Sequence, residues 1–292
     1  MTGLFVYARP PHYPAVNDLF TNMDSSPTRL SYDIFILIID ELASQRCYGD
    51  LRACSQTCRM LLHPCRVHLF STIHIDKNAR QFAALIKGNS TIPHYVQNLT
   101  YQPSILIEDI ANALLSLTKI RTFVLCDFHC AQGWDSLTPH IQHALIHLFS
   151  SPSVKLVSMY QSSHFPAFLL SSCSNLKHLV IHRQVSFASE MCNTILDVHR
   201  PPKLLSLNIS GATIPAEGEW YPFGKTRTDG LPLLDLSRLQ SLSFRMEGMR
   251  KVFLENILRA CLKLERLSIS GMIITTILCI MNIFTHKRMA YQ

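Results

Sequence analysis

A short apolar pattern that recurs along most of the chain is the strongest constraint on its fold. The pattern has the form apolar-x-x-apolar-x-apolar, and its central position falls at residues 99, 123, 157, 179, 207, 242 and 267, so copies recur 22 to 35 residues apart. The last four copies have Leu at both of the first two positions. Alternating apolar residues predict a strand, and their recurrence predicts a repeat array. The copies are Val96, Leu99, Tyr101; Ile120, Phe123, Leu125; Val154, Val157, Met159; Leu176, Leu179, Ile181; Leu204, Leu207, Ile209; Leu239, Leu242, Phe244; and Leu264, Leu267, Ile269.

Helices are predicted between several of these strands, because residues 105–117, 137–149 and 252–262 carry apolar residues at helical spacing. One strand with one helix cannot bury its own apolar face, so successive units are expected to stack into a continuous core with a parallel sheet along one side. The 48% hydrophobic content is ample for such a core. Phe70, Ile73 and Ile75 form a further copy at the start, and Cys173 and Cys261 occupy the same offset in their copies.

The polar residues between the apolar strand positions are expected to point away from the core, on a concave surface. Our candidates for binding a target protein there are Lys177, His178, His182, Asn208 and Arg266. The alternative is that they are ordinary solvated strand residues. Residues 211–231 form a long insertion rich in Gly and Pro, and its aromatic residues Trp220 and Tyr221 are further target-binding candidates, because exposed loop aromatics often serve recognition.

Three short helices are predicted ahead of the repeats, in a module over residues 29–68 that follows a flexible leader over residues 1–28. Ser31 is expected to cap the first helix, with Asp33 in its first turn. Gly49 is expected to end the turn after that helix, and Asp50 to cap the second. Pro64 is expected to interrupt the helical pattern that follows.

The first helix is apolar on every side over residues 34–39, although a module of this size cannot bury all the faces of one helix. Part of that surface is therefore expected to dock onto a partner. The alternative is that the repeat domain of the same chain covers it.

These features together resemble an F-box protein of the fungal type with C-terminal leucine-rich repeats. The F-box resemblance is carried by Leu30-Ser31-Tyr32-Asp33-Ile34, by Ile38, Ile39 and Leu42, by Asp50-Leu51, and by Cys54 with Thr57-Cys58-Arg59. Residues 68–73 resemble the strand that commonly follows the box, and the copies with Cys173 and Cys261 resemble cysteine-containing leucine-rich repeats. The expected fold is α/β: a three-helix F-box-like module, then an irregular solenoid of about seven repeats over residues 69–292.

The resemblance implies a non-catalytic substrate-recognition subunit of a Skp/cullin/F-box-type ubiquitin ligase. The module would bind the Skp-family adaptor, and through it the cullin, while the repeats present an unknown protein substrate. The adaptor-binding residues that it implies are Leu30, Ser31, Ile34, Ile38, Ile39, Leu42, Leu51, Cys54, Cys58 and Arg59. The alternative is a repeat scaffold without ligase coupling, because Ser31 and Leu61 stand where the family usually has Pro and often has Trp.

Charge and cysteine usage bear on partners and compartment. The net charge of +7 is scattered, so no nucleic-acid partner is expected. The N-terminus lacks a signal-peptide pattern, which predicts a cytoplasmic or nuclear protein whose ten cysteines are mainly buried and reduced. Residues 267–285 carry no charge, and we expect a buried final strand and helix there rather than a membrane anchor. The chain stops soon after the last copy without a polar cap, which indicates a truncated array.

No catalytic motif stands out, so the sequence predicts neither an enzyme nor a cofactor; a small hydrolase or transferase with an unrecognised site is the alternative from another class. The best metal candidates are Cys54, Cys58, Cys65 and His68, followed by Cys126, His129 and Cys130, and by the pair His178 and His182. Their spacing matches no familiar zinc site, and no metal is expected.

Overall fold

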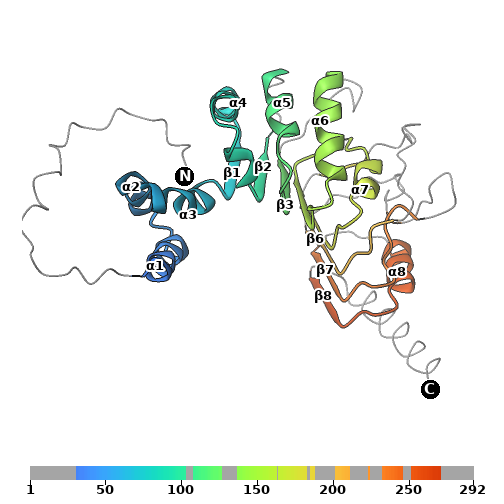
Figure 1. Ribbon diagram of the computed structural model, residues 1–292. Coiled ribbons are helices and arrows are strands. Elements are labelled where there is room, and N and C mark those ends of the chain that lie inside the picture. Colours follow the sequence, from blue (N-terminus) through green and yellow to red (C-terminus); the bar gives the residue numbers. More distant parts are fainter. Residues whose placement is uncertain are drawn as a thin grey trace, which may run out of the picture. The chain divides into compact units, whose positions relative to one another are not determined.

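The computed structural model describes residues 31–102, 108–126, 137–162, 164–182, 185–187, 201–210, 223, 232–245 and 251–270. The chain divides into two compact units, residues 1–71 and residues 72–292. The described part of the first unit is helical, and that of the second is an α/β arrangement built on one parallel sheet (Figure 1).

Three helices make up the described part of the first unit: α1 (Tyr32–Ser44), α2 (Tyr48–Thr57) and α3 (Arg59–Leu69). The prediction of three short helices is therefore confirmed. Ser31 lies at the N-cap of α1 as expected, and its carbonyl accepts the amide of Ile34, but its side chain makes no capping hydrogen bond. Asp33 lies in the first turn, where a negative charge is favourable next to the helix dipole.

Two expected helix boundaries in this unit are wrong. Gly49 and Asp50 lie inside α2, whose N-cap is Cys47, because the chain turns one step earlier, at Arg46 with its φ of 58°. Pro64 lies inside α3, and the break comes at Cys58, which is extended between α2 and α3. The helix continues through Pro64 because its apolar face remains packed on both sides of that residue.

A small apolar core holds the three helices together. Its buried members are Ile39 of α1, Leu51 of α2, and Leu61 and Cys65 of α3, and Phe35, Leu42, Ala43, Cys54 and Leu69 pack against them. Leu61, Cys65 and Leu69 follow one another at a spacing of four, so one face of α3 supplies much of this core.

The second unit is built on an eight-stranded parallel sheet whose strands follow the order of the sequence. Each strand pairs with its neighbours in the chain, from β1 at one edge to β8 at the other. The bounds are β1 (Thr72–Ile75), β2 (Asn98–Tyr101), β3 (Thr122–Cys126), β4 (Leu156–Tyr160), β5 (His178–Ile181), β6 (Ser206–Ser210), β7 (Ser241–Arg245) and β8 (Arg266–Ser270).

The recurring apolar positions lie in register across the whole sheet. The central residues pair in the order Ile73, Leu99, Phe123, Val157, Leu179, Leu207, Leu242 and Leu267, which are the seven predicted centres and the additional first copy. From β1 to β7 these residues are buried. The prediction that each copy contributes one strand to a parallel sheet is confirmed.

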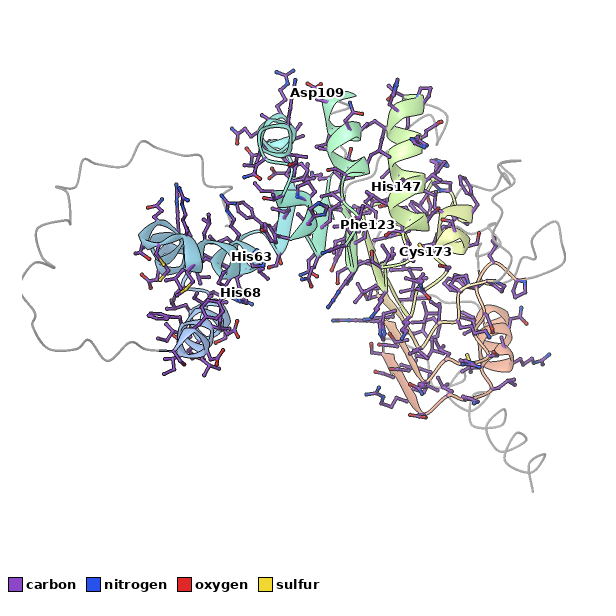
Figure 2. The ribbon with its side chains drawn as sticks, in the orientation of Figure 1. His63, His68, Asp109, Phe123, His147 and Cys173 are labelled. Atoms are coloured by element: carbon purple, nitrogen blue, oxygen red, sulfur yellow. The ribbon has the colours of Figure 1, made fainter. Side chains whose placement is uncertain are left out.

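Helices connect several strands and lie along one face of the sheet (Figure 1). They are α4 (Ala79–Gly88), α5 (Glu108–Leu115), α6 (Pro139–Ser150), α7 (Phe168–Ser172) and α8 (Lys251–Ala260), with a 3₁₀ turn at Ile92–His94. The three helices predicted between strands correspond to α5, α6 and α8. The Phe149 ring of α6 and the Phe123 ring of β3, which is labelled in Figure 2, meet in a T-shaped arrangement with centroids 5.2 Å apart, so this contact joins the helix layer to the sheet.

The two cysteines at the shared offset are both buried directly after a helix, Cys173 after α7 and Cys261 after α8. The Cys173 thiol donates to the carbonyl oxygen of Leu169 at 3.5 Å. Burial raises the pKa of this thiol, which therefore stays protonated. The prediction of small buried core cysteines is correct at these positions.

Among the described helices, none is long and apolar enough to cross a membrane. The uncharged segment 267–285 is described only as far as Ser270, which ends β8. Its remainder lies outside the described residues.

Candidate interaction surfaces

Helix α1 has two apolar faces, of which only one is buried. Phe35, Ile39 and Leu42 point into the module core. Ile34, Leu37 and Ile38 lie at spacings of three and four and are 40%, 67% and 45% exposed. We call these three residues the α1 apolar face. The sequence prediction of a surplus apolar surface on this helix is therefore supported by its exposure.

Burial divides the predicted adaptor-binding residues into two groups. Ile39 and Leu51 are 1% and 0% exposed, so their expected role in contacting a partner is corrected: they form the module core. Leu42 and Cys54 are partly buried against that core. Ile34 and Ile38 are exposed, as are Ser31, Cys58 and Arg59, and Leu30 lies outside the described residues.

Leu37 is the residue that the sequence-based set omitted. It is the most exposed of the three residues of the α1 apolar face. Leu37 and Ile38 lie three and four residues after Ile34, and these spacings place all three residues on one side of a helix. This spacing is the sequence signal that could have identified Leu37.

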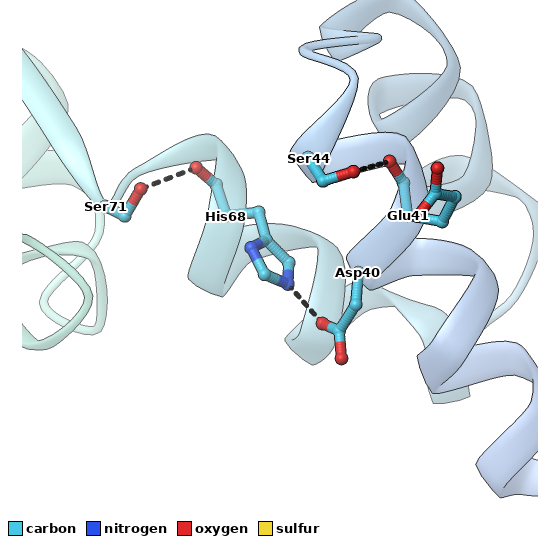
Figure 3. A network of polar contacts seen from close by, with 5 residues as sticks. All are labelled: Asp40, Glu41, Ser44, His68 and Ser71. Atoms are coloured by element: carbon cyan, nitrogen blue, oxygen red, sulfur yellow. Dashed lines mark hydrogen bonds and ion pairs between the residues drawn. The ribbon is translucent and has the colours of Figure 1, made fainter.

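A polar contact between two helices helps to hold α1 in place. The Nε2 atom of His68 on α3 lies 2.8 Å from a carboxylate oxygen of Asp40 on α1 (Figure 3). Near it, the Ser44 hydroxyl donates to the carbonyl of Glu41, and the Ser71 hydroxyl donates to the carbonyl of His68. The Asp40 side chain is 55% exposed, so this pair contributes orientation more than stability.

The face of the sheet opposite its apolar strand residues carries the predicted target-binding residues. We call it the outward face. His178 begins β5 and is partly exposed before the buried Leu179, and Asn208 lies in the middle of β6, partly exposed between two buried neighbours. Arg266 begins β8 and is exposed. The predicted alternation of buried and outward residues is confirmed on β5, β6 and β7.

The remaining predicted target-binding residues flank β5 or lie elsewhere. Lys177 is exposed directly before β5, and His182 follows directly after it. Trp220 and Tyr221 lie outside the described residues.

Side chains of neighbouring strands interact along this face. The Nδ1 atom of His178 lies 2.7 Å from the Ser206 hydroxyl, and that of His182 lies 2.9 Å from the Ser210 hydroxyl. The His182 ring also stacks on Tyr160, with centroids 3.8 Å apart and planes inclined by 12°. These contacts join β4, β5 and β6 through residues that are far apart in the sequence, so a local sequence pattern could not predict them.

Both histidines are shifted toward their neutral form. Desolvation lowers the pKa of His178, and the nearby charge of Lys177 lowers it further. Desolvation lowers the pKa of His182. At neutral pH these residues are therefore uncharged hydrogen-bonding groups, which suits recognition of a partner surface without a charge of their own.

The two Ser–His contacts do not make a hydrolase site as they stand. A serine nucleophile needs a histidine that a third group orients, usually a carboxylate. Within the described residues, no carboxylate forms a hydrogen bond with His178 or His182.

The candidate metal ligands do not gather into a site in the part of the chain that is described. Burial, and then the proximity of Cys54 and Cys58, raises the pKa of the Cys65 thiol. His68 contacts Asp40 instead of these cysteines. No group of three or more His, Cys, Asp or Glu residues in the described segments has an arrangement that could hold a metal ion. His129 and Cys130 lie outside those segments.

No family model, curated protein or solved structure matches this chain. The assignment of a role therefore rests on the two surfaces described above.

Proposed function

We propose that this chain is a non-catalytic substrate-recognition subunit of a Skp/cullin/F-box-type ubiquitin ligase. In this proposal the α1 apolar face docks the adaptor, and the outward face of the sheet binds the target protein. The observation that carries the proposal is the exposure of Ile34, Leu37 and Ile38 on a helix whose opposite side is packed. Three large aliphatic side chains at helical spacing form the kind of surface that docks into an apolar groove of a partner.

The sheet supports the second half of the proposal. Parallel strands in sequence order, with apolar residues in register on every rung, are what stacked leucine-rich repeats would produce. The described helices of the second unit lie along one face of the sheet in Figure 1, and the proposal places the target on the other face of the described strands. Its neutral histidines and hydroxyl groups offer hydrogen bonds to a protein target.

Such a subunit would act by position alone. A target held on the sheet would stay near the ubiquitin-charged component that the adaptor and cullin bring, which raises the effective concentration of its lysines there. The seven described cysteines are free thiols, which suits the reducing cytoplasm or nucleus where this ligase class is expected.

Binding of the purified full-length chain to a purified Skp-family adaptor tests the proposal. We expect a complex on gel filtration, and we expect co-purification of adaptor and cullin from native cells. Aspartate at Leu37 should abolish both, because a charge would then be buried at the interface. Leu262→Asp is the matched control, since Leu262 is 58% exposed in the second unit. Absence of a complex with the folded wild-type chain would contradict the ligase role.

A scaffold without ligase coupling is the alternative, and the structure determines how to test it. Leu61 is 9% exposed in the module core, so Trp at this position would overpack the core and unfold the module instead of restoring binding. Ser31 is exposed and has a φ of −63°, which proline adopts without strain. If the Ser31→Pro variant binds the adaptor and the wild-type chain does not, the alternative of a scaffold without ligase coupling is favoured.

A further inference from the structure

Three basic residues stand next to one another where the central strands of the sheet begin. Arg121, Lys155 and Lys177 directly precede β3, β4 and β5. The amide of Lys155 donates to the carbonyl of Arg121, and the amide of Lys177 donates to the carbonyl of Lys155, both at 2.9 Å. The three residues therefore occupy successive rungs, about 4.8 Å apart. We call them the basic row.

The basic row is exposed, and none of its members forms an ion pair with a described residue. The uncharged Gln97 precedes it on the same line of backbone hydrogen bonds and the uncharged Leu205 follows it, so the three cations occupy successive rungs between neutral residues. Like charges held this close repel one another, and an anionic partner would relieve that repulsion. Burial lowers the pKa of the neighbouring His178, and the charge of Lys177 lowers it further.

An aliphatic patch lies on the outward face of the three strands that the basic row directly precedes. Val124, Ser158 and Val180 are register partners on β3, β4 and β5, and Leu156 precedes Ser158 by two residues on the same face. The two valines and Leu156 are partly exposed. Ser158 is only 5% exposed, and its hydroxyl has no hydrogen-bond partner in the structure. A ligand side chain placed here would gain apolar contact with the two valines and Leu156.

We propose that the basic row and this patch together bind an acidic segment of a partner protein, with its carboxylates on Arg121, Lys155 and Lys177 and an aliphatic side chain on Val124, Leu156 and Val180. The inference rests on the proposed function, because it names the class of target that the outward face selects. Two or three carboxylates of an extended segment span the roughly 10 Å length of the row.

The chemistry of the patch favours a protein over a nucleic acid. Single-stranded nucleic acids bind where bases stack on free aromatic rings beside the cations. Val124, Leu156 and Val180 are aliphatic, and the nearby Tyr160 ring is already stacked on His182. Aliphatic side chains of a peptide are the better match for this surface.

Fluorescence anisotropy with the purified full-length chain tests the inference. The probe is a fluorescein-labelled dodecapeptide with four successive Asp residues followed by Leu and Val in a Gly/Ser background. We expect saturable binding that weakens from about 50 to about 300 mM salt, since the charges are exposed. The variant R121E/K155E/K177E should weaken binding about tenfold or more. The control variant K77E/K87E/K263E makes the same change of charge at exposed lysines of the second unit and should bind within about twofold of wild type.

Equal losses in the two charge-reversed variants, or no binding of the peptide by the wild-type chain, would overturn the inference. Tighter binding of a single-stranded oligonucleotide of the same length would overturn it too. Adaptor binding by the same preparations separates this inference from the proposed function. If the wild-type chain fails to bind the adaptor but binds the peptide through the basic row, the ligase role is wrong and the acidic-segment inference stands.

Discussion

Replacing Leu37 by alanine removes the largest exposed part of the α1 apolar face. Full burial of a leucine side chain contributes about 1.5–3 kcal/mol, and Leu37 is 67% exposed before any partner binds. About two thirds of that energy is therefore available on docking, or roughly 1–2 kcal/mol. Since each 1.4 kcal/mol corresponds to a factor of ten, affinity for the adaptor should fall by roughly 5- to 30-fold.

The stability of the module should not change with this substitution. Leu37 is outside the group of residues that forms the core, and alanine favours a helix at least as strongly as leucine. Ile39→Ala is the contrasting variant, because Ile39 is 1% exposed and its truncation should lower the free energy of unfolding by about 2–5 kcal/mol.

Isothermal titration calorimetry with the purified adaptor measures the affinity, and urea unfolding followed by circular dichroism measures the stability. Leu262→Ala serves as the affinity control, because it truncates an exposed leucine of the second unit, 58% exposed against 67% for Leu37. An L37A variant that binds the adaptor as tightly as wild type would refute docking through the α1 apolar face. A loss of affinity accompanied by a loss of helicity would refute the claim that Leu37 is outside the module core.

Three further outcomes follow from the sheet. Leu179→Ala should lower the free energy of unfolding by about 2–5 kcal/mol, because Leu179 is buried. Val180→Ala, on the outward face, should lower it by less than about 1.5 kcal/mol. Equal losses of stability in urea unfolding would contradict the assignment of these two residues to opposite faces. Tyr101→Phe should raise stability by about 1 kcal/mol or leave it unchanged, because the buried hydroxyl has no hydrogen-bond partner and burial raises the pKa of Tyr101 to about 12. The folded pKa values of His178 and His182 lie below the unfolded value near 6.5, so the unfolded chain binds more protons, and the urea midpoint should fall as pH drops from about 7.5 to 5.5. An unchanged pH dependence in a variant with Gln at both positions would show that these histidines are not its source.

Much of the sheet could be predicted because its determinant is local and periodic. An apolar residue at every second position specifies which side of a strand is buried. The same positions are apolar in each neighbouring strand, so the buried sides face the same way across the sheet. Leu179, Leu207 and Leu242 therefore lie in register without any knowledge of the loops between them. The same periodicity identified the outward candidates His178 and Asn208.

In the first unit, local sequence patterns did not determine which residues are buried or where a helix ends. A helix that is apolar on every side could bury either of its faces, and only packing against α2 and α3 places Ile39 inside and Leu37 outside. Pro64 was expected to end a helix from its own chemistry, yet Leu61 and Cys65 remain on one packed face across it. In both cases tertiary contacts outweigh a local preference of a few kcal/mol.

The sequence by itself determined the repeating apolar positions, the parallel α/β class and the surplus apolar surface of the first helix. Only the tertiary structure decided which side chains became neighbours. Tyr160 meets His182, and His178 meets Ser206, across loops of unequal length, because strand pairing brings distant residues onto adjacent rungs. The basic row depends on the same pairing, since Arg121 and Lys155 are far apart in the chain but adjacent in the sheet.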